Sequence, residues 1–227
     1  PGNGMHVQGW MGTDGIVSTN GATTNIVVKA GKSMAAKATA KATYSNNLNS
    51  SALTVSSLSG GTTTSITSLA GGTSSTSGST TTYTASSANP VTITLSDGTT
   101  VTRTDGSYVS GTVYSSTAST ASPVTLTMSD GTTVTETSGT YVAGHSLPVT
   151  TTITAYDTLG VAHSIPIYFT KTSTNSTDGN QWTVSLDSDT TKSTSSIAES
   201  DGTTTALSMT SGTVQFTTEG KYKSGSG

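Results

Sequence analysis

The chain has 227 residues, with 9 Lys or Arg, 12 Asp or Glu and a formal net charge of −3. The absence of Cys excludes disulfides, thiolate metal sites and a Cys nucleophile, and the absence of a basic cluster argues against nucleic acid as a partner. Hydrophobic residues make up 30% and charged residues 9%, while Ser, Thr and Gly fill the difference. Because Thr suits a pleated surface, we predict an all-β protein of small barrel-like or sandwich-like domains. No apolar run approaches the roughly 20 residues of a membrane-spanning helix, so no membrane partner is expected.

Residues 1–52 are short pieces punctuated by glycine, and their start resembles a fragment cut from a longer chain. Residues 25–28, Asn-Ile-Val-Val, predict a strand. Residues 32–44 are rich in Ala, which favours helix, but Ala alternates with Lys and Thr at a period of two. That period is typical of a strand with a small-residue face, so we expect a strand there.

Residues 53–147 differ in composition. Their first part, residues 53–88, is a low-complexity Ser/Thr/Gly segment, which we interpret as a flexible linker. An internal repeat follows, because residues 90–111 and 123–144 align at an offset of 33 with 16 of 22 positions identical. Each copy runs into Asp-Gly, at residues 97–98 or 130–131, which is the turn signature of a β-hairpin. Each hairpin has too little apolar surface to stand alone, so we expect two matching hairpins that pack together or onto a neighbour.

The most apolar stretch, residues 150–187, predicts three consecutive strands with alternating apolar residues. A turn is expected from Asp157 to Gly160, because Gly takes positive φ and Asp bonds its own following backbone. Pro166 lacks a backbone donor, which places it on an edge strand or at a bulge. Trp182 is expected to be buried against the apolar face of the preceding strand. The remaining predicted elements are a polar loop at residues 189–205, a strand at residues 212–216 and a turn at Glu219-Gly220.

Residue types that carry chemistry are present but form no recognisable site. The histidines His6, His145 and His163 are too scattered in the sequence to predict a metal cluster, and His163 is interpreted as a structural residue at the start of a strand. Asp187 and Asp189 lack the spacing of a calcium loop and are interpreted as a solvated turn. Ser is abundant, yet no nucleophile elbow and no phosphate-binding glycine loop occurs. We therefore predict no catalytic, cofactor-binding or metal-binding residue, and no enzyme.

Three groups of segments together match one family. Residues 154–184 carry T-x-Y-D-x-x-G-x-x-H-x-x-x-x-Y-F-x-K followed by a W-x-V strand. The pattern residues are Thr154, Tyr156, Asp157, Gly160, His163, Tyr168, Phe169, Lys171, Trp182 and Val184. Before them stand V-Q-G-W at residues 7–10, S-M-A-A-K-A-T at residues 33–39 and N-L-N-S at residues 47–50, and after them G-T-V-Q-F-T-T-E-G-K-Y-K-S-G at residues 212–225. In this order the segments resemble the β-domains of the bacterial flagellar hook protein. The block at residues 53–147 is longer than its counterpart in that family and resembles an insertion.

The resemblance implies a structural subunit that stacks with other copies into the flexible extracellular tube between the motor rod and the filament, with its β-domains forming outer-layer contacts. It also implies three parts: residues 1–52 from the inner β-domain, residues 53–147 as a Ser/Thr-rich insertion, and residues 148–227 as the outer β-domain. Because no amphipathic or heptad helix occurs in the chain, we expect this fragment alone to be monomeric.

Two other classes remain open. A cell-surface adhesin or stalk built from Thr-rich β-repeats explains the duplicated hairpins but leaves the ordered matches to chance. A secreted carbohydrate-active enzyme or binding module needs paired carboxylates in a recognisable motif or a row of exposed aromatic residues. Aromatic residues are only 5% of the chain, which disfavours the binding module.

Overall fold

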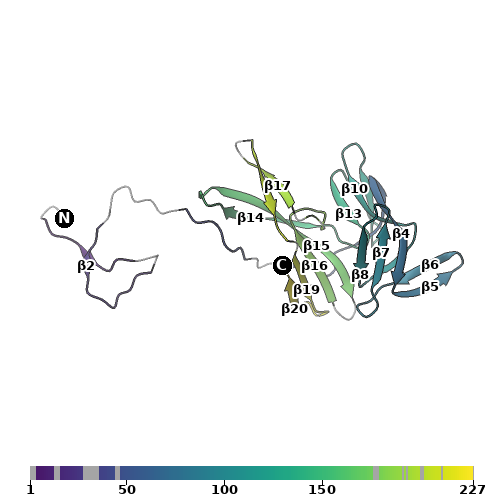
Figure 1. The fold of residues 1–227 in the computed structure, drawn as a ribbon, viewed down its shortest axis with the longest axis horizontal. Helices are drawn as coiled ribbons and strands as arrows, with labels where there is room; N and C mark the ends of the chain where they lie inside the picture. Colours follow the sequence, from purple (N-terminus) through teal and green to yellow (C-terminus); the bar gives the residue numbers. More distant parts are fainter. Residues whose placement is uncertain are drawn as a thin grey trace. The chain divides into compact units, whose positions relative to one another are not determined.

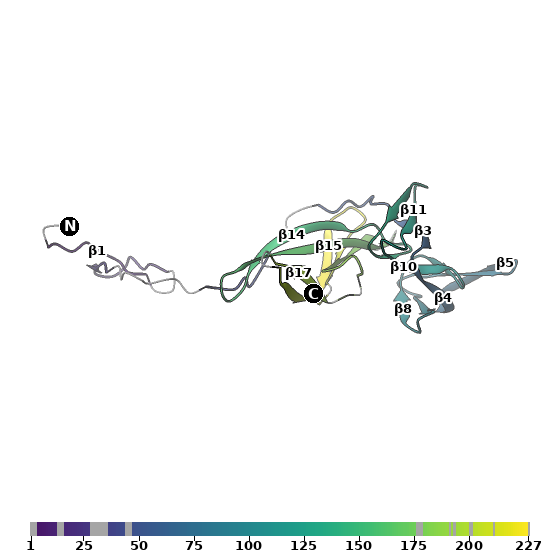
Figure 2. The same ribbon diagram turned by 90° about the horizontal axis from the view of Figure 1, so that it is seen from above.

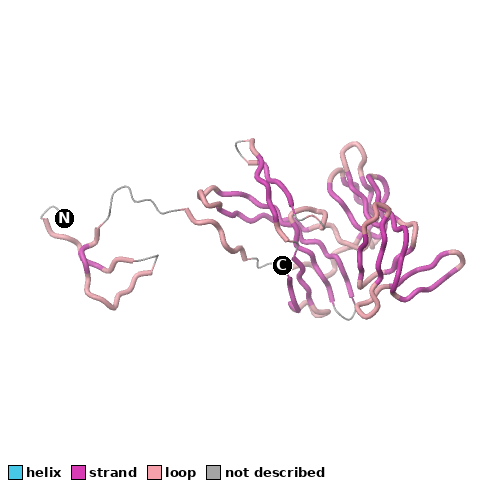
Figure 3. The backbone as a smooth tube through the Cα atoms, viewed as in Figure 1, coloured by secondary structure: helices cyan, strands magenta, loops and turns pink. Residues whose placement is uncertain are grey.

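In the computed structural model, the chain consists of strands, turns and loops, and Figure 3 shows no helix among the residues that the structure describes. The described residues are 4–12, 16–27, 36–43, 47–175, 179–190, 192, 194–199, 202–210 and 212–226. Nothing in these ranges is a helix of the length and apolarity that crossing a membrane requires. The all-β class expected from composition is confirmed. The chain divides into two compact units, Pro1–Lys37 and Ala38–Gly227.

The first unit contains one small antiparallel pair, β1 (Gln8–Gly9) with β2 (Thr24–Asn25). Trp10 donates its indole N–H to the carbonyl oxygen of Gly21 at 2.7 Å, which ties the loop between the two strands. The strand predicted at residues 25–28 is largely wrong, because β2 ends at Asn25 and residues 26 and 27 lie outside any strand. Residue 28 lies outside the described residues.

The strand predicted at residues 32–44 is wrong in the part that the structure describes. Residues 36–43 are neither strand nor helix, and all of them are exposed; residues 32–35 and 44 lie outside the described residues. Thr39 is hydrogen-bonded to a strand, since its N–H donates to the carbonyl oxygen of Tyr156 and its hydroxyl accepts the Tyr156 N–H, both at 2.9 Å. The physical reason is that alternating Ala and Thr side chains offer little apolar area to bury.

The second unit ends in a five-stranded antiparallel sheet of order β14-β15-β16-β19-β20, here called the carboxy-terminal sheet (Figure 1). A separate hairpin, β17–β18, lies between β16 and β19 in the sequence. The bounds are β14 Val149–Tyr156, β15 Ala162–Asn175, β16 Gly179–Ser185, β17 Thr194–Ala198, β18 Thr204–Ser208, β19 Gly212–Phe216 and β20 Tyr222–Ser226. The three strands predicted in residues 150–187 and the strand at residues 212–216 are confirmed. The loop predicted at residues 189–205 is wrong in part, because it contains β17.

The turn between β14 and β15 forms as the sequence predicts. Asp157 accepts at Oδ1 the N–H groups of Leu159 and Val161, at 2.8 and 2.9 Å. Gly160 has a φ of +83°, which Gly adopts without steric cost.

Pro166 and Trp182 lie where the sequence placed them. At Pro166, β15 pairs with β14 alone, because β16 pairs with β15 only from Tyr168 onwards. The strand is therefore locally an edge, where a missing donor is tolerated. Trp182 is 1% exposed and lies between Lys171 and Val214 on neighbouring strands. It is a core residue of this sheet.

Residues 53–147 form two β-lobes, and the flexible linker predicted at residues 53–88 is wrong. Those residues contain four strands, β3 to β6. The bounds in the lobes are β3 Val55–Gly60, β4 Thr62–Gly71, β5 Thr73–Ser77, β6 Thr80–Thr84, β7 Val91–Leu95, β8 Thr100–Arg103, β9 Ser107–Val109, β10 Val113–Ala118, β11 Val124–Met128, β12 Thr133–Glu136 and β13 Gly139–Val142.

The duplicated hairpins are confirmed as β7–β8 and β11–β12. Their registers are identical at the offset of 33, with Ile93 opposite Val101 in one copy and Leu126 opposite Val134 in the other. In both turns the Asp carboxylate accepts the N–H of the Thr two residues later at 2.9 Å. The repeat in the sequence is therefore a repeat in structure.

The two lobes are copies of one fold, and one copy is inserted into the other. We call residues 66–111 the nested lobe, and residues 54–65 together with 112–144 the host lobe. Leu58 in β3 lies opposite Leu126, as Leu69 in β4 lies opposite Ile93. Host-lobe positions that precede the nested lobe in the sequence match nested-lobe positions 11 residues later. Host-lobe positions that follow the nested lobe match nested-lobe positions 33 residues earlier. Strand β4 is shared, since its first half pairs with β10 of the host lobe and its second half with β7 of the nested lobe.

Each lobe has its own small core, and the two cores use equivalent positions. The host lobe buries Val55, Leu58, Ala118, Val124, Leu126, Met128 and Tyr141. The nested lobe buries Ile66, Ala85, Val91, Ile93, Leu95 and Tyr108, together with Tyr114 from the host lobe.

A pair of glycines moves the chain from one sheet of each lobe to the other. Gly60 and Gly71 have φ values of +77° and +80°, and a Cβ on either would come within 2.5 Å of the carbonyl oxygen of Pro123 or Pro90. No other residue fits this close approach without moving the backbone.

Candidate functional site: the junction between the lobes and the carboxy-terminal sheet

Lys171, in β15, holds both ends of the segment that forms the lobes. Its Nζ donates to the carbonyl oxygens of Ser50, at 3.1 Å, and of Ala52, which lead into the host lobe. Its backbone binds the returning segment, because its N–H donates to Ser146 Oγ and its carbonyl accepts the Ser146 N–H, both at 2.9 Å. Lys171 is 4% exposed, and burial lowers the pKa of its ammonium group. Its side-chain partners are carbonyl dipoles, which satisfy the buried charge.

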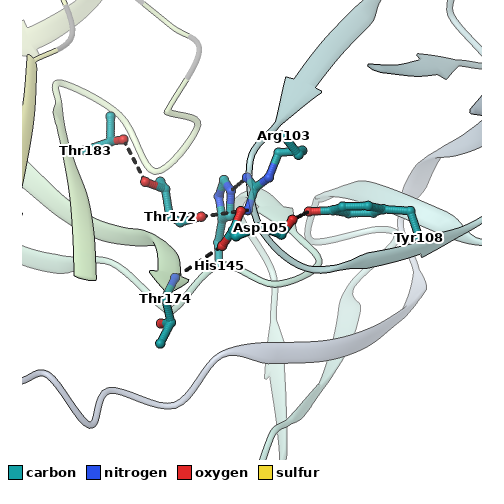
Figure 4. A network of polar contacts seen from close by, with 7 residues as sticks. All are labelled: Arg103, Asp105, Tyr108, His145, Thr172, Thr174 and Thr183. Atoms are coloured by element: carbon teal, nitrogen blue, oxygen red, sulfur yellow. Dashed lines mark hydrogen bonds and ion pairs between the residues drawn. The ribbon is translucent and has the colours of Figure 1, made fainter. Parts of the chain in front are cut away.

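Arg103, at the end of β8 in the nested lobe, reaches His145, which directly follows the host lobe, and the carboxy-terminal sheet (Figure 4). Its guanidinium lies 2.6 Å from Nε2 of His145 and donates to the carbonyl oxygen of Thr172 at 2.7 Å and to Asp105 Oδ1 at 3.1 Å. The side chains of Arg103 and Asp105 are 10% and 12% exposed. A planar, permanently charged fork can serve three acceptors at once, so this one residue ties the nested lobe to β15.

His145 follows the last strand of the host lobe and is buried. A guanidinium can only donate, so Nε2 is the acceptor and the ring proton resides on Nδ1. Burial, and then the positive charge of Arg103, lower the pKa of His145 to about 3. The ring is therefore neutral at pH 7, as its role as acceptor requires.

Two further contacts join the lobes to the carboxy-terminal part. Asp105 Oδ2 accepts the N–H of Thr174 in β15 at 3.2 Å. Ser188 Oγ, in the loop after β16, accepts the N–H of Thr140 in β13 at 3.4 Å. Arg103, Asp105, His145, Thr172 and Thr174 form one connected polar network at the junction. Such networks favour one arrangement of their members because each unsatisfied buried group is costly.

His163 forms a second polar cluster, away from the junction. Its Nδ1 lies 2.8 Å from Glu199 Oε1 and its Nε2 lies 3.3 Å from Asp157 Oδ2. The hydrogen bonds to these two carboxylates raise the pKa of His163. The cluster connects the β14–β15 turn to the end of β17. In the described part of the chain, no group of three or more His, Cys, Asp or Glu side chains could hold a metal ion.

The carboxy-terminal sheet and the end of the junction next to it correspond to a known domain. Residues 143–227 match the sequence model of the family described as flagellar basal body protein FlaE D2 domain. This match supports a flagellar hook protein, and we call these residues the D2 domain after the family that they match. Comparison with curated proteins and with solved structures gave no match. Hook proteins are structural, and many subunits of them assemble into the polymeric hook, an extracellular part of the flagellum.

The D2 domain contributes the residues of the junction that bind the lobes and the segment leading into them. His145, Ser146 and Lys171 lie within the matched residues, whereas Arg103 and Ala52 lie outside them. Both ends of the lobe segment and the nested lobe are therefore fixed by residues of the D2 domain itself.

The residues weighed in the sequence analysis belong to different parts of the structure. His145 belongs to the junction, His163 lies between two carboxylates, and His6 is exposed in the first unit. Asp187 Oδ1 accepts the N–H of Asp189 at 3.0 Å, so the pair forms a local turn as expected, but both residues are half-buried and not solvated as predicted.

The junction was not predicted from the sequence, although charge differences between the two copies of the repeat indicated part of it. The two copies differ at six of 22 positions, and two of these differences change charge: Arg103 stands where the second copy has Glu136, and Asp105 where it has Ser138. These two departures are the nested lobe's contribution to the junction. Lys171 gave no comparable signal, because a single Lys in an alternating strand is ordinarily a solvated residue.

Proposed function

We propose that the chain is the outer, β-rich part of a flagellar hook subunit, whose copies stack into the flexible tube between motor rod and filament. In this proposal the β-domains make the outer-layer contacts between neighbouring subunits, and the chain catalyses no reaction. The observation that carries the proposal is the match of residues 143–227 to the D2 family. The junction supports it, because Lys171 and Arg103 fix two further lobes to the D2 domain and thereby enlarge the surface that it offers to neighbours.

The proposed division assigns residues 1–52 to the inner β-domain, residues 53–147 to an insertion and residues 148–227 to the outer β-domain. Support for the middle part comes from the lobes, which occupy residues 54–144 and have their own cores. The segment before them has a structural role in the second unit, since Thr39 binds Tyr156 and Ser50 binds Lys171.

The composition of the surface suits contacts that must change as a tube bends. Charged residues are only 9% of the chain, and most exposed strand residues in the lobes are Ser or Thr. Small polar contacts can be exchanged with water or with another hydroxyl at little cost, whereas large apolar interfaces resist sliding.

The experiment is immunogold electron microscopy of the source bacterium with antibodies raised against the purified chain. The proposal predicts gold confined to the short curved segment between the cell surface and the filament. Antibodies absorbed beforehand with the purified chain are the control. Gold spread over the cell envelope or over other surface fibres would contradict the proposal and favour an adhesin or stalk.

A further inference from the structure

The sheet edges of the two lobes differ in their protection against pairing with another chain. Edge strands β8 and β12 carry Arg103 and Glu136, and a charge on an edge opposes edge-to-edge pairing. Edge strand β13 is capped, because Ser188 accepts the N–H of Thr140. Among the described residues, the edge of β5 carries neither a charge nor a cap, and the edge of β9 carries no charge and is capped at Val109, whose carbonyl oxygen accepts the N–H and the hydroxyl of Thr112. Strand β3 is capped at its start, because Val55 exchanges backbone hydrogen bonds with Gly144 and His145. Residues 42–96, which include β3 and β5, contain no charged side chain.

The edge of β9 lines a groove between the lobes, which β3 also lines. The groove has a volume of about 580 Å³, and its walls include residues 55–58 of β3 and residues 106–109 around β9. At the offset of 33, Ser107 in β9 is the counterpart of Thr140 in β13. The D2 domain places the hydroxyl of Ser188 on Thr140, and no described residue does the same for Ser107. The groove thus leaves open, at Ser107, a backbone position whose counterpart is covered in the other copy.

The unprotected edge of β5 lies on a hairpin that projects from the nested lobe. Figures 1 and 2 both show β5–β6 extending away from the strands of the lobes. Nine of the ten residues from 73 to 82 are Ser or Thr, and the tenth is Gly78. Strand β5 is exposed along its whole length and pairs with β6 without a bulge. This hairpin therefore offers on its outer edge the type of group, a hydroxyl, that Ser188 offers to β13.

We propose that the β5–β6 hairpin of one copy docks in the inter-lobe groove of a second copy and adds β5 to the free edge of β9. The two strands are opposite edges of one three-stranded sheet, β5-β6-β9, so the contact joins two different surfaces and is heterologous, which allows it to repeat from copy to copy. Backbone hydrogen bonds across the new edge provide the attraction, and paired Ser and Thr side chains provide the contacts on each face. The inference rests on the proposed role as an assembling subunit, and it specifies which surfaces meet.

Cross-linking between single-Cys variants tests the contact, because the chain has no Cys of its own. Ser75→Cys labels the middle of β5 and Ser107→Cys labels β9. The two proteins are mixed in equal amounts at high concentration and treated with a short bismaleimide. The matched control replaces Ser107→Cys with Thr140→Cys, the equivalent position on the capped edge. The heterodimer with Ser107→Cys should form about tenfold faster than the control heterodimer, because docking raises the local thiol concentration.

A charge on β5 provides the second variant. Ser74→Lys, added to the Ser75→Cys chain, should lower the rate with Ser107→Cys to that of the control, while the circular dichroism spectrum stays unchanged. Equal rates for Ser107→Cys and Thr140→Cys would overturn the inference. Predominance of the Ser75→Cys homodimer would also overturn it, because that product pairs β5 with itself. Immunogold labelling of cells does not depend on either result, so the proposed function is tested separately.

Discussion

Replacing His145 with Gln is expected to make the protein less sensitive to acid. In the folded chain, burial and the charge of Arg103 hold the pKa of His145 at about 3, against an ordinary value of 6.5. Below pH 6.5 the unfolded state therefore binds a proton that the folded state does not, and stability falls as the pH falls. The loss is about 1.4 kcal/mol for each pH unit between the two pKa values, or roughly 2.5–3 kcal/mol between pH 6.5 and pH 4.5. Gln does not titrate, and its side-chain oxygen can still accept from Arg103.

The assay is urea unfolding followed by the fluorescence of buried Trp182, at about pH 7 and about pH 4.5. Stability of the wild type should drop between these conditions by roughly 2.5–3 kcal/mol more than that of His145→Gln. His163→Gln is a control for which the expected change in stability with pH has the opposite sign. The raised pKa of His163 gives a contribution that is present below its ordinary pKa and is lost as the pH rises through the raised value. Equal pH dependence in the wild type and His145→Gln, or a ring titration of His145 near 6.5 by NMR, would refute the reasoning.

The other predictions concern the core, the glycine switches, the nested copy and self-association. Trp182→Ala should lower the free energy of unfolding by about 3–5 kcal/mol, whereas Ala in place of Tyr222, which is 67% exposed, should change it by less than about 0.5 kcal/mol; equal urea midpoints for the two variants would contradict this. Gly71→Ala should cost more than Gly98→Ala, because both have positive φ but only Gly71 has a carbonyl oxygen 2.5 Å from the added Cβ; equal costs in thermal unfolding would contradict it. Deleting residues 67–110 should leave a folded host lobe, read as retained amide protection in β11 and β12. The chain alone should sediment as a monomer at micromolar concentration, and a stable oligomer or filaments would show that the β-domains drive assembly themselves.

The strands of the D2 domain could be predicted because local rules and tertiary packing agree there. The alternation of apolar and polar residues predicted β15 and β16. Asp157 and Gly160 predicted the turn between β14 and β15, and Trp182 was predicted to be buried in the core. The strand expected in residues 32–44 failed because alternation of small residues marks an extended backbone without supplying area to bury. Without apolar area to bury, residues 32–44 gain too little free energy from joining a sheet.

In the lobes the opposite error occurred, because the composition indicated a flexible linker where the structure has strands. In residues 53–88 the apolar residues are sparse, and the glycine pairs interrupt any regular period. A repeat at an offset of 11 was nevertheless present, in Ser-Leu-Ser-Gly-Gly-Thr from residue 57 and Ser-Leu-Ala-Gly-Gly-Thr from residue 68. Each of these segments pairs with one of the duplicated hairpins, so a repeat in a low-complexity segment indicated structure better than its composition did.

The junction could be predicted only in part, because it depends on contacts far apart in the chain. Arg103 and Thr172 are 69 residues apart, and Lys171 and Ser50 are 121 apart. Nothing local to Lys171 indicates that its ammonium group is buried against carbonyl oxygens. The charge differences between the repeats mark Arg103 and Asp105 as unusual but do not name their partners.

A reconstruction of the intact hook by electron cryomicroscopy tests the central claim most directly. The D2 domain and the two lobes are fitted into the density, with the sheet order and the junction held as described. The account predicts that these parts fill the outer layers of the tube, with the lobes between neighbouring subunits. Density that places residues 143–227 along the central channel, or an outer surface without room for the lobes, would contradict it.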